Sequence, residues 1–151
     1  DTNYSNTDFN TPTNQGGEYR NDGVDIEKCQ DENSNGFCVG WTEKGEWLTY
    51  TVEIEQTGIY LISFRLTSEK KGGRFYLTMN GRKAGKIVSV PQINGLEKWE
   101  TIHAGSVHLN KGKQTFRINI KTGGFKLNFF KAQKINKATI NSEEFNGGKI
   151  F

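Results

Sequence analysis

The chain has 151 residues, of which 33% are hydrophobic and 12% aromatic, and its formal net charge is +3. This length predicts one domain, spanning residues 1–151, with a sizeable core. The 20 basic residues are scattered among 17 acidic ones, and no apolar run approaches the roughly 18 residues of a membrane span. We therefore expect neither nucleic acid nor a membrane as a partner.

The first part of the chain carries few signals of regular structure. Residues 1–17 are rich in Asn, Thr and Gly without periodicity, which predicts a loop, and residues 23–27 form a candidate short strand. Cys29 and Cys38 then bracket a polar loop and are either a disulfide or two free thiols. We predict the disulfide, which implies an oxidising compartment. A zinc site is not indicated, because the two histidines are distant and show no ligand spacing.

Residues 39–54 combine a glycine-turned loop with a clear alternation. Four apolar side chains fall on one face of the second half, at Leu48, Tyr50, Val52 and Ile54. A period of two with aromatic and β-branched residues indicates a half-buried antiparallel strand. Since the following segments repeat this pattern, we expect this strand to lie at the centre of a sheet.

Further short strands are expected along the chain after this one, at intervals of roughly 8–12 residues. Their expected ranges are 59–67, 75–79, 86–90, 103–109, 116–120 and 126–132. Asn80-Gly81 predicts a type I′ hairpin, since both central positions of that turn need a positive φ. No segment has a long 3.6-residue period. The fold class is therefore all-β, most simply a β-sandwich, with a closed barrel as the alternative.

Motifs for catalysis are missing from the sequence. There is no GxSxG elbow, no phosphate-binding Walker loop and no HExxH. His103 and His108 lack an evident partner, and the glutamates of the strands and turns are expected on the surface. We therefore predict a protein without a catalytic site.

Two aromatic residues lie near turns instead of within alternating strands. These are Tyr19 and Trp99. An aromatic ring in water suits a saccharide, because the C–H face of a pyranose packs on the ring while its hydroxyls take polar partners. The alternative is that both rings cap the ends of the core.

Three segments resemble family 6 carbohydrate-binding modules. They are GGEYRNDGVDIE, VGWTEKGEWLTYTVEIEQTGIYLISFRLTS and the late GGFKLNFFKAQ, in order and with the turns in register. The resemblance implies a jelly-roll β-sandwich of two antiparallel sheets that binds polysaccharide without cleaving it. It further implies a covalently linked glycoside hydrolase catalytic domain.

The resemblance also implies a sugar site in the loops at one end of the sandwich. Tyr19 of GGEYR and Trp99 of LEKWET match the Tyr and Trp that hold one sugar ring. The family motif similar to GGFNLNW has an Asn where this chain has Lys126, and the next Asn is Asn128. In this chain Lys126 or Asn128 would donate to the sugar, and Glu18 would accept.

Some family members carry a second sugar-binding site on the concave sheet face. In this sequence no aromatic residue is clearly indicated for such a site. Trp47 is expected to pack structurally, and the role of Trp41 stays open.

The order of the strands departs from the family. A first strand similar to IEAEDYDGG is missing at the start, whereas residues 139–149 contain INSEEFNGG. Circular permutation is one explanation and the one we prefer. The other is a fragment of a tandem array, whose last strand belongs to the next module.

Calcium is the cofactor that the resemblance implies. The family often holds a structural Ca²⁺ with carboxylates of that first strand and a residue of the final strand. Glu143 is the best match, with Asn141 and Asn128 in the partner positions. Oxygen ligands of this kind suit calcium.

Together these inferences predict a monomeric module that is secreted or attached to the cell surface. We expect its ligand to be a β-1,3-glucan such as laminarin, with xylan, mixed-linked glucan and agarose as alternatives. The rival classes are a small polysaccharide-degrading enzyme and a structural adhesion domain.

Overall fold

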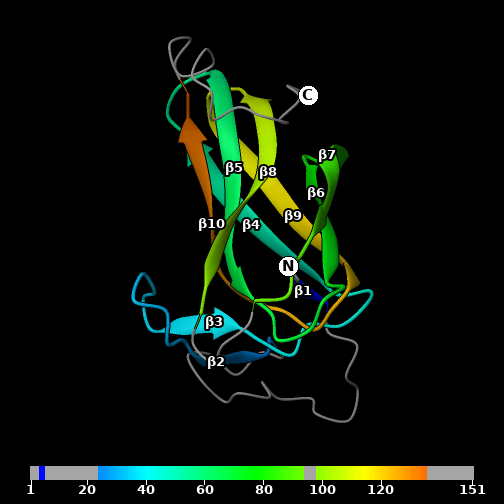
Figure 1. The fold of residues 1–151 in the computed structure, drawn as a ribbon. Helices are drawn as coiled ribbons and strands as arrows, with labels where there is room; N and C mark the ends of the chain where they lie inside the picture. The colour runs from blue at the N-terminus through cyan, green and yellow to red at the C-terminus, as the bar shows by residue number, and fades with distance from the viewer. Residues whose placement is uncertain (1–3, 6–23, 94–97, 136–151) are drawn as a thin grey trace.

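A computed structural model describes residues 4–5, 24–93 and 98–135. Within these residues ten strands form two five-stranded sheets, and all neighbouring strands are antiparallel. The strands are β1 (Tyr4–Ser5), β2 (Ile26–Lys28), β3 (Phe37–Val39), β4 (Trp47–Ile54), β5 (Gly58–Thr67), β6 (Arg74–Met79), β7 (Arg82–Ser89), β8 (Glu100–Leu109), β9 (Gly112–Thr122) and β10 (Lys126–Lys134). The architecture is the predicted jelly-roll β-sandwich (Figure 1).

The two sheets interleave strands from distant parts of the chain. The first sheet has the order β1-β4-β9-β6-β7, and the second has the order β2-β3-β10-β5-β8. The short hairpin of β2 and β3 thus extends the second sheet at its β10 edge, and both strands lie at one end of the molecule (Figure 1).

The predicted alternation decides which side chains fill the space between the sheets. Leu48 and Ile54 of β4 are buried, and Tyr50 and Val52 pack against the core. On β5 the buried set is Tyr60, Ile62, Phe64 and Leu66. Because successive side chains of a strand point to opposite faces, each of these sets lies on one face of its sheet.

Phenylalanines from both sheets meet in the middle of this core. Phe64, Phe75 and Phe116 are fully buried, and the rings of Phe64 and Phe75 are in edge-to-face contact with centroids 4.7 Å apart. Each such pair adds about 0.5–1.5 kcal/mol beyond the burial of its area.

The hairpin predicted at Asn80-Gly81 is confirmed. The two residues join β6 to β7 with φ angles of 48° and 79°, both positive as a type I′ turn requires. The Asn80 side chain also accepts from the Thr115 amide and donates to Gln114, which ties the turn to β9.

Two expectations from the sequence differ from the structure. The strand β4 is not central, because its outer neighbour is the two-residue edge strand β1, and β9 occupies the middle of that sheet. Tyr4–Ser5, within the predicted N-terminal loop, pairs with Leu48 and Trp47. Two paired residues are too few to produce an alternation that the sequence could display.

Candidate functional site

The ends of three neighbouring strands converge where β5 ends and β8 and β10 begin. Lys126, the first residue of β10, pairs with Thr67 on β5, and Leu66 pairs with Glu100, the first residue of β8. Trp99 immediately precedes Glu100, so the same register brings it level with Thr67. Across three strands the backbones of Lys126 and Trp99 lie about 10 Å apart. The structure therefore brings two predicted site residues to one end of the sandwich, where β5 ends and β8 and β10 begin.

Trp99 is partly exposed at this end, so its ring is not enclosed in the core. The residues before it, 94–97, lie outside the described part of the chain. A partly exposed tryptophan beside a loop can pack one face on a ligand while the protein supports the other.

Lys126 has a charged partner that the sequence did not suggest. Its ammonium lies 2.7 Å from Oε1 of Glu27, with 46% and 21% of the two side chains exposed. Glu27 approaches over Gly40, where a Cβ would meet this same oxygen at 2.8 Å. A side chain at position 40 would therefore displace the end of Glu27 from this place, but no pattern in the sequence links position 40 to Glu27.

Trp41 is a second exposed aromatic residue near this end. Its side chain is 42% exposed, and its backbone has a φ of 44°, which is uncommon for a bulky residue. The next residue, Thr42, accepts hydrogen bonds from the amides of Phe125 and Gly124, and its hydroxyl donates to the Phe125 carbonyl. Trp41 is thereby fixed beside the turn that leads into Lys126. Such strained backbone is concentrated at functional sites.

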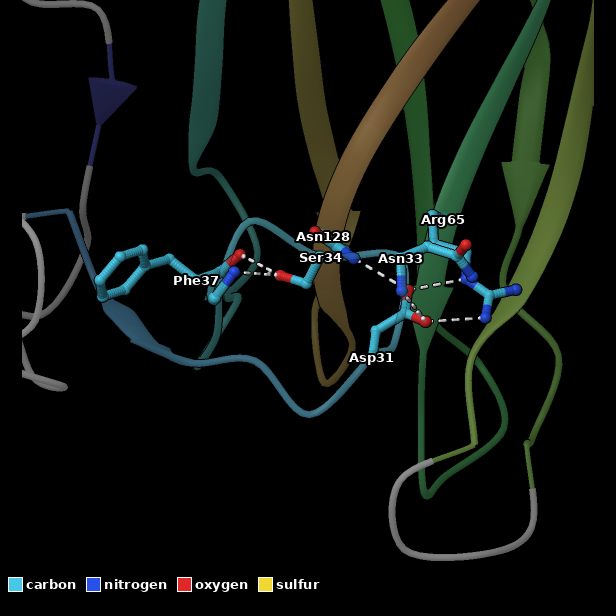
Figure 2. A network of polar contacts seen from close by, with 7 residues as sticks. Asp31, Asn33, Ser34, Phe37, Arg65 and Asn128 are labelled. Carbon is cyan, nitrogen blue, oxygen red and sulfur yellow. Dashed lines mark hydrogen bonds and ion pairs between the residues drawn. The ribbon is translucent and has the colours of Figure 1, made fainter.

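Asn128 belongs to a separate polar network, shown in Figure 2. It lies at a β-bulge of β10, and its amide donates to Oδ2 of Asp31 at 2.8 Å. Arg65 of β5 donates to both oxygens of Asp31, at 2.7 and 2.9 Å. These contacts join the β2–β3 loop to two strands.

The Asp31 carboxylate is ionised in this network. Its side chain is only 1% exposed. The hydrogen bonds from Arg65 lower the pKa of Asp31 from 3.8 to about 2, while burial opposes the shift and the bonds from Asn128 and the Asn33 amide support it. The network therefore explains Asn128 structurally, and its role toward a sugar or a metal stays a prediction.

Four of the predicted site residues lie outside the described residues. They are Glu18 and Tyr19 of the sugar site and Asn141 and Glu143 of the calcium site. The whole segment 139–149, which resembles the first strand of the family, also lies outside them. Within the described ranges, no group of three or more His, Cys, Asp or Glu side chains could hold a metal ion. Of the three predicted calcium ligands only Asn128 is described, so calcium remains a prediction.

The disulfide predicted between Cys29 and Cys38 is absent from the structure, where both are free thiols. Cys38 is buried in β3 opposite Glu27, and Cys29 follows β2. Burial, together with the Cys29 thiol and the Glu27 carboxylate, raises the pKa of Cys38 well above its usual value. Since the thiolate is the species that reacts, this environment holds Cys38 in its unreactive form.

The outer face of the first sheet carries a different kind of aromatic arrangement. Arg117 of β9 lies over the ring of Trp47 of β4, 3.8 Å from its centroid, and Lys83 of β7 lies 5.7 Å from the ring of Tyr76. Each pair is a cation–π contact within the protein. The guanidinium covers the face of Trp47 that a sugar would need, which agrees with the structural role expected for this residue.

The site at the strand ends therefore combines ring faces with a charged donor and acceptor. Trp99 and Trp41 offer apolar surface, and Lys126 and Glu27 offer strong hydrogen-bonding groups beside it. This combination on the loops of a jelly roll has the chemistry that a saccharide-binding β-sandwich requires. Hydrophobic packing under a pyranose ring and hydrogen bonds at its edge are the two interactions that such a site provides.

The chain belongs to family 6 of the carbohydrate-binding modules. The model of this family, "Carbohydrate binding module (family 6)", matches residues 15–135. Members of this family are non-catalytic, so the chain is a polysaccharide-binding module and not an enzyme. The family expected from the sequence motifs is thus confirmed.

Two solved structures and one curated relative show the similarity in detail. A module of Cellvibrio mixtus lichenase 5A, solved with cellotriose, is 30% identical, with a TM-score of 0.65 over 76% of this chain and 88% of that one. A β-1,3-glucan-binding family 6 module from Bacillus halodurans is 26% identical, with a TM-score of 0.62 over 74% and 86%. The clotting factor G alpha subunit of Tachypleus tridentatus is 31% identical over 117 residues, 74% of this chain.

The chain spans 17% or less of the length of the curated relatives that it matches. Two of these relatives are glycoside hydrolases, a mannan endo-1,4-β-mannosidase B from Piromyces and the β-agarase AgaO from Microbulbifer thermotolerans. Among the described residues, no helix is long and apolar enough to cross a bilayer.

Proposed function

We propose that this module binds β-1,3-glucan of the laminarin type at the end of the sandwich where Trp99 and Lys126 lie. The partly exposed Trp99, at the same end of the sheet as the charged Lys126–Glu27 pair, carries this proposal. The sugar ring packs on Trp99 and, as the family motif implies, on Tyr19, with Glu18 and Asn128 as further predicted polar partners. The choice of glucan is supported by the similar module from Bacillus halodurans, which binds β-1,3-glucan.

The binding site is tested by titration calorimetry of the module against oligosaccharides of laminarin, xylan, mixed-linked glucan and agarose. We expect laminarin oligosaccharides to bind most tightly. Trp99→Ala should weaken that binding by about tenfold or more, because a stacked aromatic contributes on the order of 1–2 kcal/mol in a partly desolvated site. Trp47→Phe is the matched control on the other sheet and should leave binding within about twofold.

Binding that survives in Trp99→Ala would show that the sugar site lies elsewhere. Absence of binding to every oligosaccharide in the panel would favour the adhesion domain instead. Tight binding of xylan, mixed-linked glucan or agarose in place of laminarin would retain the site and replace the ligand.

We also propose that the module directs an attached glycoside hydrolase to its polysaccharide, as a monomer outside the cell. Hydrolase relatives of much greater length support the linkage. In the full-length protein, deletion of the module should slow release of reducing ends from insoluble glucan and leave the rate on soluble oligosaccharides unchanged. Equal slowing on both substrates would contradict a targeting role. Detection of the protein in the culture supernatant tests its location, and light scattering tests the monomer.

A further inference from the structure

We propose that the outer face of the first sheet, turned away from the core, binds an anionic polysaccharide that carries sulfate or carboxylate groups. The strands β9, β6 and β7 build this face and lie side by side in that order. The sugar site proposed above lies at strand ends of the second sheet and shares no residue with it. The two sites differ in ligand class, since one takes a neutral glucan and the other a charged polymer.

The three strands of this face are rich in cations and contain no acidic residue. They carry seven basic side chains and neither Asp nor Glu. The seven are Arg74, Arg82, Lys83, Lys86, Lys113, Arg117 and Lys121. Most acidic residues of the chain instead precede residue 70. Basic residues that are scattered in the sequence are thus gathered by the fold on one part of the surface.

Strand register places two of these cations in one row across the face. Arg117 of β9 pairs with Thr78 of β6, and Thr78 pairs with Lys83 of β7. Because Phe116 and Ile118 are buried on either side of Arg117, the Arg117 side chain lies on the outer face, as do its cross-strand neighbours. The backbones of Arg117 and Lys83 are about 10 Å apart, which is two strand spacings.

Further cations continue the row toward one end of β9. Arg74 is exposed and alternates with Tyr76, so it lies on the same face of β6. Lys121 is exposed one residue before Thr122, the partner of Arg74. Within the described part of the chain, neither Arg74 nor Lys121 forms an ion pair with a carboxylate. A polymer can contact several such cations at once, and each added contact is made at a high effective concentration.

The guanidinium of Arg117 is held in a geometry that suits an anion. It lies 3.8 Å from the centroid of the Trp47 ring, and its Nε donates to the Thr49 hydroxyl at 3.3 Å. A guanidinium has five N–H donors in one plane, so a stacked guanidinium keeps the donors of its outer edge for a ligand. Carboxylates and tetrahedral oxyanions accept two such hydrogen bonds together. Thr78, in the same row, adds a hydroxyl group.

The same contacts disfavour ligands that need an open aromatic ring. Arg117 covers one face of Trp47, and Lys83 lies 5.7 Å from the centroid of the Tyr76 ring. A neutral pyranose packs on a free ring face, and the bases of single-stranded nucleic acid stack on one. Attraction between separate charges needs neither, so an anionic polysaccharide fits this face best.

The test measures affinity for dextran sulfate, polygalacturonate and neutral dextran at low and high salt. None of these polymers is a β-1,3-glucan, so the Trp99 site does not contribute. We expect the anionic polymers to bind at low salt and neutral dextran not to bind. Raising the salt concentration should weaken binding by about tenfold or more, because it screens exposed charges.

The variant Arg117→Gln combined with Lys83→Gln should bind the anionic polymers about tenfold more weakly or worse. Lys131→Gln combined with Lys134→Gln is the matched control, since it removes the same charge from exposed positions of β10 on the other sheet. This control should change binding by about twofold or less. Laminaritetraose binding should stay within about twofold of wild type in both variants.

A second pair of substitutions tests the face without disturbing the stacked guanidinium. Arg74→Gln combined with Lys121→Gln removes two exposed cations and leaves Arg117 on Trp47. It should also weaken polyanion binding by severalfold. Thermal melting shows which variants are folded, and this pair decides if the first one unfolds.

Equal losses in the face variants and in the β10 control would overturn the proposal, because net charge alone would then attract the polymer. Failure of both anionic polymers to bind the wild type would overturn it as well, and so would tighter binding of a short DNA duplex. Stronger binding of dextran sulfate identifies sulfate as the recognised group, and stronger binding of polygalacturonate identifies carboxylate. Since laminaritetraose is measured separately, either site can fail while the other holds.

Discussion

Asp31 shows how one buried carboxylate can organise a loop that has little regular structure. It lies in the polar segment between β2 and β3, where residues 32–36 form turns and bends. Its two oxygens accept from Arg65, Asn128 and the Asn33 amide, which joins the loop to β5 and β10 (Figure 2). The hairpin that supplies Glu27 is therefore anchored by an ion pair as well as by backbone pairing.

Replacing Asp31 by Asn should lower the free energy of unfolding by about 3 kcal/mol, because it leaves the Arg65 guanidinium without its carboxylate in a largely buried position. Urea denaturation measures this loss. Glu32→Gln, one residue away and exposed, is the control and should change stability by less than about 0.5 kcal/mol. A loss for Asp31→Asn as small as that of the control would show that the network adds little stability.

The same residue predicts a pH dependence of stability with a definite sign. The pKa of Asp31 falls from 3.8 to about 2 on folding, so the unfolded chain takes up this proton more readily than the folded one. The stabilisation is complete above pH 5 and is lost as the pH falls through 3.8 toward 2, in total about 2.5 kcal/mol. The difference in unfolding free energy between wild type and Asp31→Asn, measured from pH 6 to pH 2, should shrink toward acid. A constant difference would contradict the lowered pKa.

At the level of elements, the turn between β9 and β10 and the loop after β3 support each other. Thr42 bonds to the backbone of Phe125 and Gly124, and Gly123 lies directly against the backbone of Thr42. This contact fixes Trp41 and Lys126 relative to each other, since Trp41 directly precedes Thr42 and Lys126 directly follows Phe125. The binding end of the molecule thus depends on a close approach of two backbones.

Gly123→Ala tests that contact. An added Cβ would lie 1.8 Å from the Thr42 carbonyl oxygen and 2.7 Å from the Glu43 Cα, so one backbone segment has to move. We expect a loss of about 3 kcal/mol or more in urea denaturation, at or beyond the usual range for overpacking. Sugar binding should weaken as well.

Gly124→Ala separates steric overlap from backbone strain. Its Cβ would meet nothing within 4 Å, but its φ of 85° is unfavourable for alanine, so we expect a loss of only about 1 kcal/mol. Equal losses for the two variants would show that the approach to Thr42 is not tight.

For the molecule as a whole, the periodicity of the sequence was sufficient to predict the sandwich but not to predict the site. Alternation placed Leu48, Ile62 and Phe116 in the core, because a strand with one buried face has to repeat every second residue. The same rule does not predict which strands become neighbours in a sheet. The central position of β9 and the pairing of Tyr4 with Leu48 depend on contacts between distant segments.

The candidate site could be predicted from the sequence only in part, for the same reason. Motif resemblance indicated Lys126 and Trp99, and the structure brings their strand ends together. Glu27 was not indicated, because its relation to Lys126 arises from strand pairing and from the room left by Gly40. Cys29 and Cys38 are free thiols in the structure but lie in hydrogen-bonding contact with each other, so their disulfide stays a prediction.

The net charge of the molecule predicts how salt affects the binding of neutral and charged glucans. The net charge of +3 gives the module a weak attraction for any polyanion, whereas packing and hydrogen bonding to a neutral glucan involve no charged ligand. The affinity for laminaritetraose should therefore change by less than about twofold between 50 and 500 mM NaCl, while binding of sulfated laminarin should weaken severalfold as salt screens long-range attraction. Calorimetric titrations at the two salt concentrations measure both. A tenfold loss for the neutral ligand would mean that long-range electrostatics, and not contact at the ring and its hydroxyls, sustain the complex.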